Sequence, residues 1–242
     1  MNPKLSCMMS RLAGGLAAGL WLSWNACASS QTPVRPGFSP VLAGTWPGYE
    51  RADVWKVAAQ GNYAFAAASG AGLLVFDVSN PAVPRRAGAC ETGGSASDVA
   101  LAGSYAYVAA DYEGLKVVDI RDPLHPVLAG QYETTNFPAT VVIAGQYAYL
   151  ADPYAGFEVV DISRPENPVG VGSYACSCSG LAVAGKHAYV ADPDRGLQIV
   201  DLSNPAKPAL VGSYSIQDAG AEAITVAGPY ANRCQAKPKP QG

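Results

Sequence analysis

Residues 114–130 read GLKVVDIRDPLHPVLAG, and closely related stretches begin at Gly72, Gly156 and Gly196. The four copies are spaced 42, 42 and 40 residues apart. A second motif, GSYAYVA from Gly103, begins eleven residues before Gly114 and has a counterpart at the same spacing in every other copy. Self-similarity at a fixed period of roughly 20–50 residues is typical of a repeat architecture. The fold is therefore set by one unit used four times.

Each copy predicts four short β-strands, which in the second copy are Val99–Ala102, Tyr105–Ala109, Leu115–Ile120 and Val127–Tyr132. Gly103 and Ser104 form a two-residue turn suited to a tight hairpin. The third strand is apolar on both faces apart from Lys116 and Asp119, so we expect neighbours above and below it. A four-stranded antiparallel unit of this length, buried on both faces, is typical of a β-propeller blade.

The composition agrees with an all-β chain. Glycine (26) and proline (19) are too frequent and too evenly spread for long helices, and 49% apolar residues is too high for disorder. Only 14% of residues are charged, against about 25% in a typical soluble domain. The net charge of −3 comes without a basic cluster, which argues against a nucleic-acid partner. A solenoid of this period would be mostly helical, and no helical periodicity appears.

The run L-x-V-V-D carries a family resemblance. It occurs as Leu115 to Asp119, Phe157 to Asp161, Leu197 to Asp201 and more loosely Leu73 to Asp77, each followed by an S-N-P-x-x-P-like turn. Over roughly residues 40–231 the chain resembles the LVIVD-repeat proteins. The resemblance implies a β-propeller in a bacterial or archaeal envelope or extracellular setting. It implies no reaction and no catalytic residue.

The two ends of the repeat region are incomplete. Residues 40–46 match a fourth, outer strand, while residues 224–231 match an inner strand and the start of the next. We expect an all-β propeller over residues 40–231, with four full blades and partial terminal blades, whose ring is either closed by a shared blade or incomplete. Residues 232–242 are predicted to be a disordered tail. The chain is either a shortened version of a longer propeller or a natural small one.

The N-terminal segment predicts export. Lys4 and Arg11 precede the uncharged apolar run Leu12–Leu22, which is too short to span a bilayer comfortably. Cleavage after Ala28 gives a signal peptide of residues 1–28. In a competing interpretation the signal ends at residue 26 and Cys27 becomes the lipid-modified first residue of a lipoprotein. A retained membrane anchor is the third alternative, and residues 29–39 are predicted to be a flexible linker.

We expect the protein in the periplasm, at the cell surface or outside the cell, where disulfides are permitted. Four cysteines remain after the signal: Cys90, Cys176, Cys178 and Cys234. A single Cys-x-Cys pair without a second pair or a nearby histidine is weak evidence for metal. These thiols are therefore expected to be buried or bridged, with no pairing predicted, and no metal site is expected.

One set of aspartates ends the third strand of each copy just before a turn: Asp77, Asp119, Asp161 and Asp201. A carboxylate in that place accepts backbone N–H groups of the turn, so we assign the set a structural role. Three more follow the second strand: Asp111, Asp152 and Asp192. One carboxylate per loop and no twelve-residue calcium loop predict solvated turn residues rather than a cation site.

Candidate binding residues lie where the copies differ, in the linkers between the outer strand and the next inner strand. These linkers are Glu91–Asp98, Glu133–Thr140, Ala175–Gly180 and Ser215–Glu222. Loops on a rigid scaffold are common binding sites, and propeller linkers gather at one face. The candidates are Asp98, Glu133, Asn136, Phe137, Asp218 and Glu222.

The sequence is short of catalytic parts. It contains two histidines, His125 and His187, both at structural positions of the repeat, and no GxSxG, HExxH or phosphate-binding glycine motif. We expect no enzyme, no catalytic residue and no cofactor. The leading hypothesis is an exported interaction module for an unidentified protein or glycan at the cell envelope, with membrane contact only through a lipid anchor. The alternatives are a hydrolytic propeller, for instance a carbohydrate-active one using Asp218 and Glu222, and a truncated remnant of a longer propeller.

Overall fold

The computed structural model describes residues 52–134, 137–215, 221–227 and 230–235. The predictions for the signal segment, the linker after it and Cys27 lie outside these ranges, as do those for Asn136 and Asp218. In the described part of the chain, no helix is long and apolar enough to cross a bilayer.

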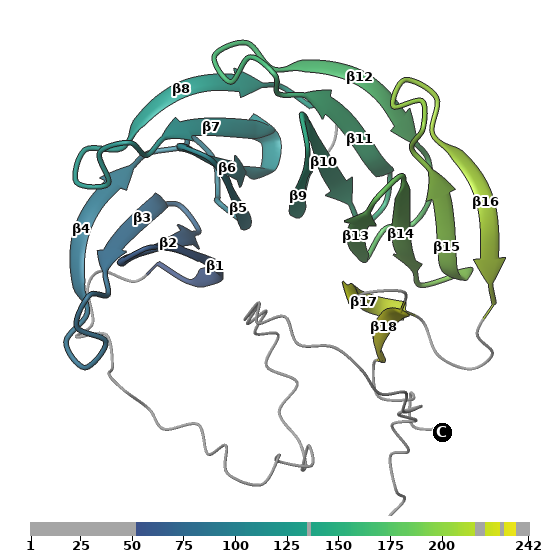
Figure 1. The fold of residues 1–242 in the computed structure, drawn as a ribbon, viewed down its shortest axis with the longest axis horizontal. Coiled ribbons are helices and arrows are strands. Elements are labelled where there is room, and N and C mark those ends of the chain that lie inside the picture. Colours follow the sequence, from purple (N-terminus) through teal and green to yellow (C-terminus); the bar gives the residue numbers. More distant parts are fainter. Residues whose placement is uncertain (1–51, 135–136, 216–220, 228–229, 236–242) are drawn as a thin grey trace, which may run out of the picture. The chain divides into compact units, whose positions relative to one another are not determined.

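The described residues form four antiparallel four-stranded sheets and one hairpin (Figure 1). Blade 1 contains β1 (Val54–Gln60), β2 (Tyr63–Ala68), β3 (Gly72–Asp77) and β4 (Arg85–Cys90). Blade 2 contains β5 (Asp98–Ala102), β6 (Tyr105–Ala109), β7 (Leu115–Asp119) and β8 (Val127–Tyr132), with a short 3-10 helix, η1 (Asp111–Glu113), between β6 and β7.

Blade 3 contains β9 (Thr140–Ala144), β10 (Tyr147–Asp152), β11 (Gly156–Asp161) and β12 (Val169–Tyr174). Blade 4 contains β13 (Gly180–Ala184), β14 (His187–Asp192), β15 (Gly196–Asp201) and β16 (Ala209–Tyr214). The hairpin consists of β17 (Ala221–Ala227) and β18 (Tyr230–Gln235). The predicted all-β fold of four full blades with a partial one is confirmed, since each copy of the repeat forms one sheet.

Consecutive blades pack face to face. The inner strand of each blade lies beside the inner strand of the next, from β1 through β5, β9 and β13 to β17. Three apolar clusters fill the junctions, and the one between blades 1 and 2 joins Phe65 and Val75 to Val108 and Val118. Burial from both sides explains why the third strands are apolar on both faces.

At each junction between the four blades, the outer strand of one blade packs against a turn of the next. A β-bulge in every outer strand leaves one residue unpaired just before a glycine. A Cβ atom on Gly88 would lie 2.5 Å from the carbonyl oxygen of Pro123, in the turn of the next blade. The same contact recurs between Gly130 and Pro165 and between Gly172 and Pro205. The glycine that recurs in each outer strand therefore packs against the proline turn that recurs in the next blade.

The last hairpin extends further than the sequence indicated. β18 continues to Gln235 and pairs with β17, so the predicted start of the tail at residue 232 is wrong. The residues after Tyr230 depart from the repeat but still form the second strand of the hairpin. Between β1 and the β17–β18 hairpin, the described strands make no packing contact comparable to those that join the four blades, which agrees with an incomplete ring.

Candidate functional site

The four carboxylates that end the third strands bind the turn that follows them. Each accepts a hydrogen bond from the backbone N–H two residues later, over distances of 2.8 to 3.0 Å. At Asp119 the guanidinium of Arg121 adds a second contact. Hydrogen bonds from the residue two positions later lower the pKa of all four carboxyls: Asp77, Asp119, Asp161 and Asp201. These groups have the geometry of turn-holding residues.

Asp98 is not an exposed linker residue, so its selection as a binding candidate was wrong. It begins β5 and is only 4% exposed. Its two carboxylate oxygens accept the backbone N–H groups of Val99 (2.7 Å) and of Val141 in the next blade (3.1 Å). Burial raises the pKa of this carboxyl. Asp98 joins two inner strands and is closed off from solvent.

Asp152 and Asp192 are also buried, contrary to the prediction of solvated turn residues. They are 5% and 1% exposed. One oxygen of each accepts two backbone N–H groups of the turn into the third strand. The second oxygen of Asp152 accepts the N–H of Phe137 at 2.7 Å, so this carboxylate fixes the linker between blades 2 and 3. Asp111 differs from both because it begins η1 and is partly exposed.

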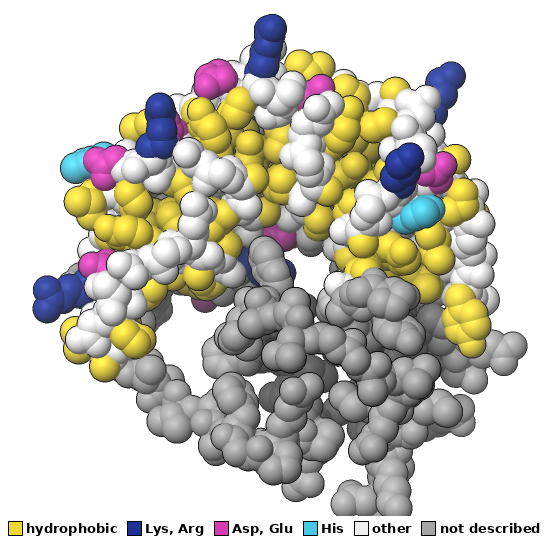
Figure 2. Space-filling view, viewed as in Figure 1, with side chains coloured by type: hydrophobic (Ala, Val, Ile, Leu, Met, Phe, Trp, Pro, Cys, Tyr) yellow, Lys and Arg dark blue, Asp and Glu magenta, His cyan; other side chains and the backbone are white. Residues whose placement is uncertain are grey.

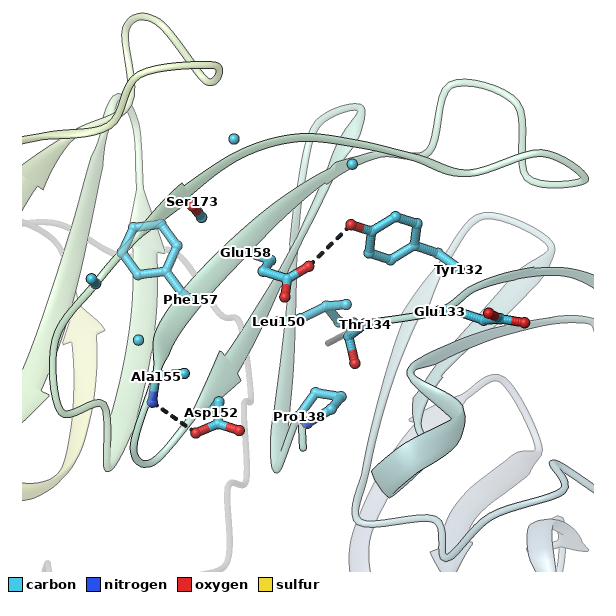
Figure 3. Close-up of a pocket in the computed structure, with 14 residues that line it drawn as sticks. Tyr132, Glu133, Thr134, Pro138, Leu150, Asp152, Ala155, Phe157, Glu158 and Ser173 are labelled. Carbon is cyan, nitrogen blue, oxygen red and sulfur yellow. Dashed lines mark hydrogen bonds between the residues drawn. The ribbon is translucent and has the colours of Figure 1, made fainter. Parts of the chain in front are cut away.

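A groove of about 390 Å³ lies where blade 2 meets blade 3. It is lined from blade 2 by the end of β8 and its linker, and from blade 3 by β10, β11 and β12. The hydroxyl of Tyr132 donates to Glu158 Oε2 across the junction at 3.0 Å, and Figure 3 shows these side chains pointing toward one another. Burial and the Glu158 carboxylate raise the pKa of the Tyr132 phenol.

The position of Glu158 distinguishes the junctions chemically. Two positions after the glycine that begins each copy of the motif, the residue is Leu74 in blade 1, Lys116 in blade 2, Glu158 in blade 3 and Gln198 in blade 4. Lys116 is 3% exposed and is held by Glu113 and Gln131. Gln198 is 1% exposed and accepts a hydrogen bond from the hydroxyl of Tyr174, while its amide donates to Asp192. Glu158 and Gln198 accept hydrogen bonds from the preceding blade, so a polar residue at this position of an apolar strand is a sequence signal for a junction that the choice of linker residues did not use.

Exposed aromatic residues are neighbours of residues that line the groove, since Phe137 precedes Pro138 and Tyr154 precedes Ala155. Phe137 and Tyr112 make an edge-to-face pair with ring centroids 4.1 Å apart. Phe137 is 46% exposed and Tyr112 is 77% exposed. Tyr154 is 92% exposed and lies in the turn whose backbone is held by Asp152. Together with Glu133, which lines the groove, these rings form what we call the groove rim: Tyr112, Glu133, Phe137 and Tyr154.

The predicted linker residues are thus only partly brought together. Glu133 lines the groove, the backbone of Phe137 is bound to the lining residue Asp152, and Asp98 is buried between blades. Glu222 lies in β17, but its side chain is not among those described, and Asn136 and Asp218 lie outside the described ranges. The groove residues that the sequence analysis did not select are mainly in strands: Tyr132, Leu150, Phe157, Glu158 and Ser173.

The cysteines whose side chains the structure describes are free thiols: Cys90, Cys176 and Cys178. Cys178 is 3% exposed, and the hydrogen bond between the Cys176 and Cys178 thiols lowers the pKa of Cys176 and raises that of Cys178. Within the described ranges, no group of three or more His, Cys, Asp or Glu side chains is placed to hold a metal ion. On the face seen in Figure 2, charged side chains are scattered among apolar ones without a basic patch.

Comparison with known proteins supports the repeat assignment. The family model described as "LVIVD repeat" matches residues 52–92, 93–134, 139–176 and 177–216, so that each match covers one blade. No curated protein matches the chain. The computationally designed Ika8 protein has a similar fold, with a TM-score of 0.61 and 11% identity over 74% of this chain and 54% of the designed one. The chain spans about half the length of that protein. On the evidence of its four matching repeats, the chain belongs to the LVIVD-repeat family.

Proposed function

We propose that this propeller is a non-enzymatic interaction module that binds a protein or glycan partner at the groove between blades 2 and 3. The observation that supports this proposal is the set of exposed side chains in the groove rim. Three exposed aromatic side chains gather there next to a concave surface of about 390 Å³. Aromatic residues are enriched at binding surfaces because they bury a large rigid area at a small entropic cost.

The chemistry of the groove suits binding through hydrogen bonds and ring contacts. Glu133, Thr134 and Ser173 supply carboxylate and hydroxyl groups to its lining. Hydroxyl-rich ligands such as glycans are bound by this combination of polar groups and aromatic faces, and so are polar peptide loops. No lysine or arginine is among the lining residues, which favours a neutral or cationic ligand over an anionic one.

Binding is favoured over acid–base catalysis because two of the three carboxylates that line the groove already hold the backbone or the junction. Asp152 accepts three backbone N–H groups, and Glu158 accepts the Tyr132 hydroxyl. A general acid or base has to exchange a proton with substrate, and these two groups hold the linker and the blade junction in place. We therefore assign the groove no reaction.

We place this module at the bacterial or archaeal envelope, as an exported protein that is either secreted or anchored through a lipid on Cys27. The support is the apolar run Leu12–Leu22 followed by Ala26-Cys27-Ala28. Metabolic labelling with a radioactive fatty acid distinguishes the two forms. Label that disappears in Cys27→Ser supports the anchor, and an exported but unlabelled chain supports secretion.

The binding proposal is tested with a glycan array and with envelope extracts passed over the immobilised full-length chain. We expect a ligand to be retained by the wild type and lost from Phe137→Ala and Tyr154→Ala, with affinity reduced about 30-fold if these rings are central contacts. His125→Ala is the matched control. His125 is an exposed side chain in the turn between β7 and β8, at the opposite end of the strands.

Equal retention by the wild type and both aromatic variants would contradict the proposed site. Turnover of a glycoside or ester substrate by the purified chain would contradict the non-enzymatic assignment. Thermal melts of the variants separate these outcomes from misfolding, because both replaced rings are exposed and their loss leaves the core unchanged.

A further inference from the structure

The outer strand of a blade meets the following blade through three residues in a fixed order. In blade 3 these are the bulge residue Val171, the glycine Gly172 and the terminal Tyr174. Val171 packs in the same cluster as Leu202 of blade 4, and Gly172 lies against the carbonyl of Pro205. The hydroxyl of Tyr174 donates to Gln198 at 2.8 Å.

Blade 4 carries the same three residues, and among the described residues none of these contacts to them is found. Val211 is 57% exposed and Tyr214 is 69% exposed, whereas their counterparts in blade 3 are partly buried. Among the described residues, the nearest atom to a Cβ on Gly212 is Cδ1 of Ile199 in the same blade, at 3.8 Å. Val211, Gly212 and Tyr214 form what we call the blade 4 socket.

The position after blade 4 already holds two strands of a blade. β17 packs beside β13 and β14, where the inner strand of a next blade belongs, and β18 pairs with β17 (Figure 1). At all three complete junctions the glycine meets the turn before the fourth strand of the next blade, and at the two junctions that have a terminal tyrosine its hydroxyl meets the third strand. Those two strands are the part of a blade that the socket would meet.

We propose that the blade 4 socket binds a β-hairpin of the third-and-fourth-strand type, supplied by a repeat of a partner chain. The established junctions define its chemistry. A carboxylate or amide at the position equivalent to Glu158 and Gln198 would accept a hydrogen bond from the Tyr214 hydroxyl. An apolar residue at the position equivalent to Leu202, after the strand-ending aspartate, would cover Val211. The carbonyl of the first turn proline would lie against Gly212. The third strand would add to β18 by main-chain hydrogen bonds, as in β-strand addition.

The test uses a fluorescent peptide of residues 156–174, which is the third-and-fourth-strand hairpin of blade 3, titrated with the full-length chain. We expect saturable binding by fluorescence anisotropy and at least a tenfold loss of affinity in Gly212→Val, because the new side chain occupies the place of the proline carbonyl. Leu210→Ser is the matched control. Its counterpart Leu128 is 47% exposed even where a blade follows, so that position lies outside the junction with the following blade.

Gly212→Val also keeps the test independent of folding, because its Cβ meets only ordinary contact distances within blade 4. Tyr214→Phe should lower the affinity for the peptide several-fold, because the hydroxyl that donates to Glu158 is removed. A peptide with Glu158→Val should bind the wild-type chain with an affinity that is lower by the same factor. When the variant chain and the variant peptide are combined, the affinity should fall no further. Absence of saturable binding would overturn the proposal. Equal affinity of the peptide for the wild type and Gly212→Val would overturn it as well.

Discussion

Replacing Gly88 with alanine places a methyl group where blade 1 meets blade 2. Its Cβ would lie 2.5 Å from the carbonyl oxygen of Pro123 and 2.9 Å from that of Leu124. Both atoms belong to the backbone of a turn and cannot move aside as a flexible side chain would. Such overpacking costs about 1–3 kcal/mol. Gly212→Ala makes the same change at the equivalent position of blade 4, where the nearest described atom is 3.8 Å away.

The two alanine variants should therefore shift stability in opposite directions. Alanine lowers the entropy of the unfolded chain and adds about 0.4–1 kcal/mol of stability where the native backbone accepts it. For a domain of this size, about 2–4 °C of melting temperature corresponds to 1 kcal/mol. We expect Gly88→Ala to melt roughly 5 °C below the wild type and Gly212→Ala to melt slightly above it, as measured by circular dichroism. Equal melting temperatures for the two variants would refute the interlocking of glycine and proline turn at the blade junctions.

Three further predictions concern the side chains of the repeats. Asp119→Ala should lower the free energy of unfolding by about 1 kcal/mol, because the turn N–H of Arg121 loses its acceptor; an unchanged denaturant midpoint would argue against the turn-holding role. Since the turn carboxyls have lowered pKa values, their stabilisation is complete above the unfolded pKa of about 3.9 and is lost as the pH falls below it. Thermal melts should show this loss for the wild type and much less of it when all four residues are replaced by asparagine: Asp77, Asp119, Asp161 and Asp201. Iodoacetamide should alkylate Cys176 before Cys178, because only Cys178 combines deep burial with a raised pKa; mass spectrometry of the native protein that finds Cys178 modified first would contradict this.

The blades could be predicted from the sequence because repetition identifies each strand four times. The strands expected in the second copy match β5 to β8 within one residue at either end. The predicted start of the tail at residue 232 was wrong because it lies where the sequence no longer follows the repeat. After Tyr230 the residues Asn232 and Arg233 depart from the YAYVA pattern, yet they pair in register with Thr225 and Ile224. Backbone pairing to an existing strand needs no particular side chain.

Burial of the acidic residues could not be predicted because it depends on contacts between distant segments. The carboxylate of Asp98 accepts a hydrogen bond from the backbone N–H of Val141 in the next blade, and that of Asp152 accepts one from the N–H of Phe137 in the linker. The groove has the same origin, since Tyr132 and Glu158 belong to different blades. What the sequence does contain is the unusual carboxylate at Glu158 within an apolar strand, and this signal becomes informative once the blades are placed side by side.

The central claim is that a partner contacts the groove rim. It is tested most directly by photo-crosslinking in intact cells, with a benzophenone amino acid placed at Phe137 and, in a second strain, at Leu124. Leu124 is 50% exposed and lies in the turn between β7 and β8, at the other end of the strands. We predict a discrete crosslinked partner or glycan adduct from position 137 and none from position 124. No adduct at position 137, or the same adducts from both positions, would contradict the claim.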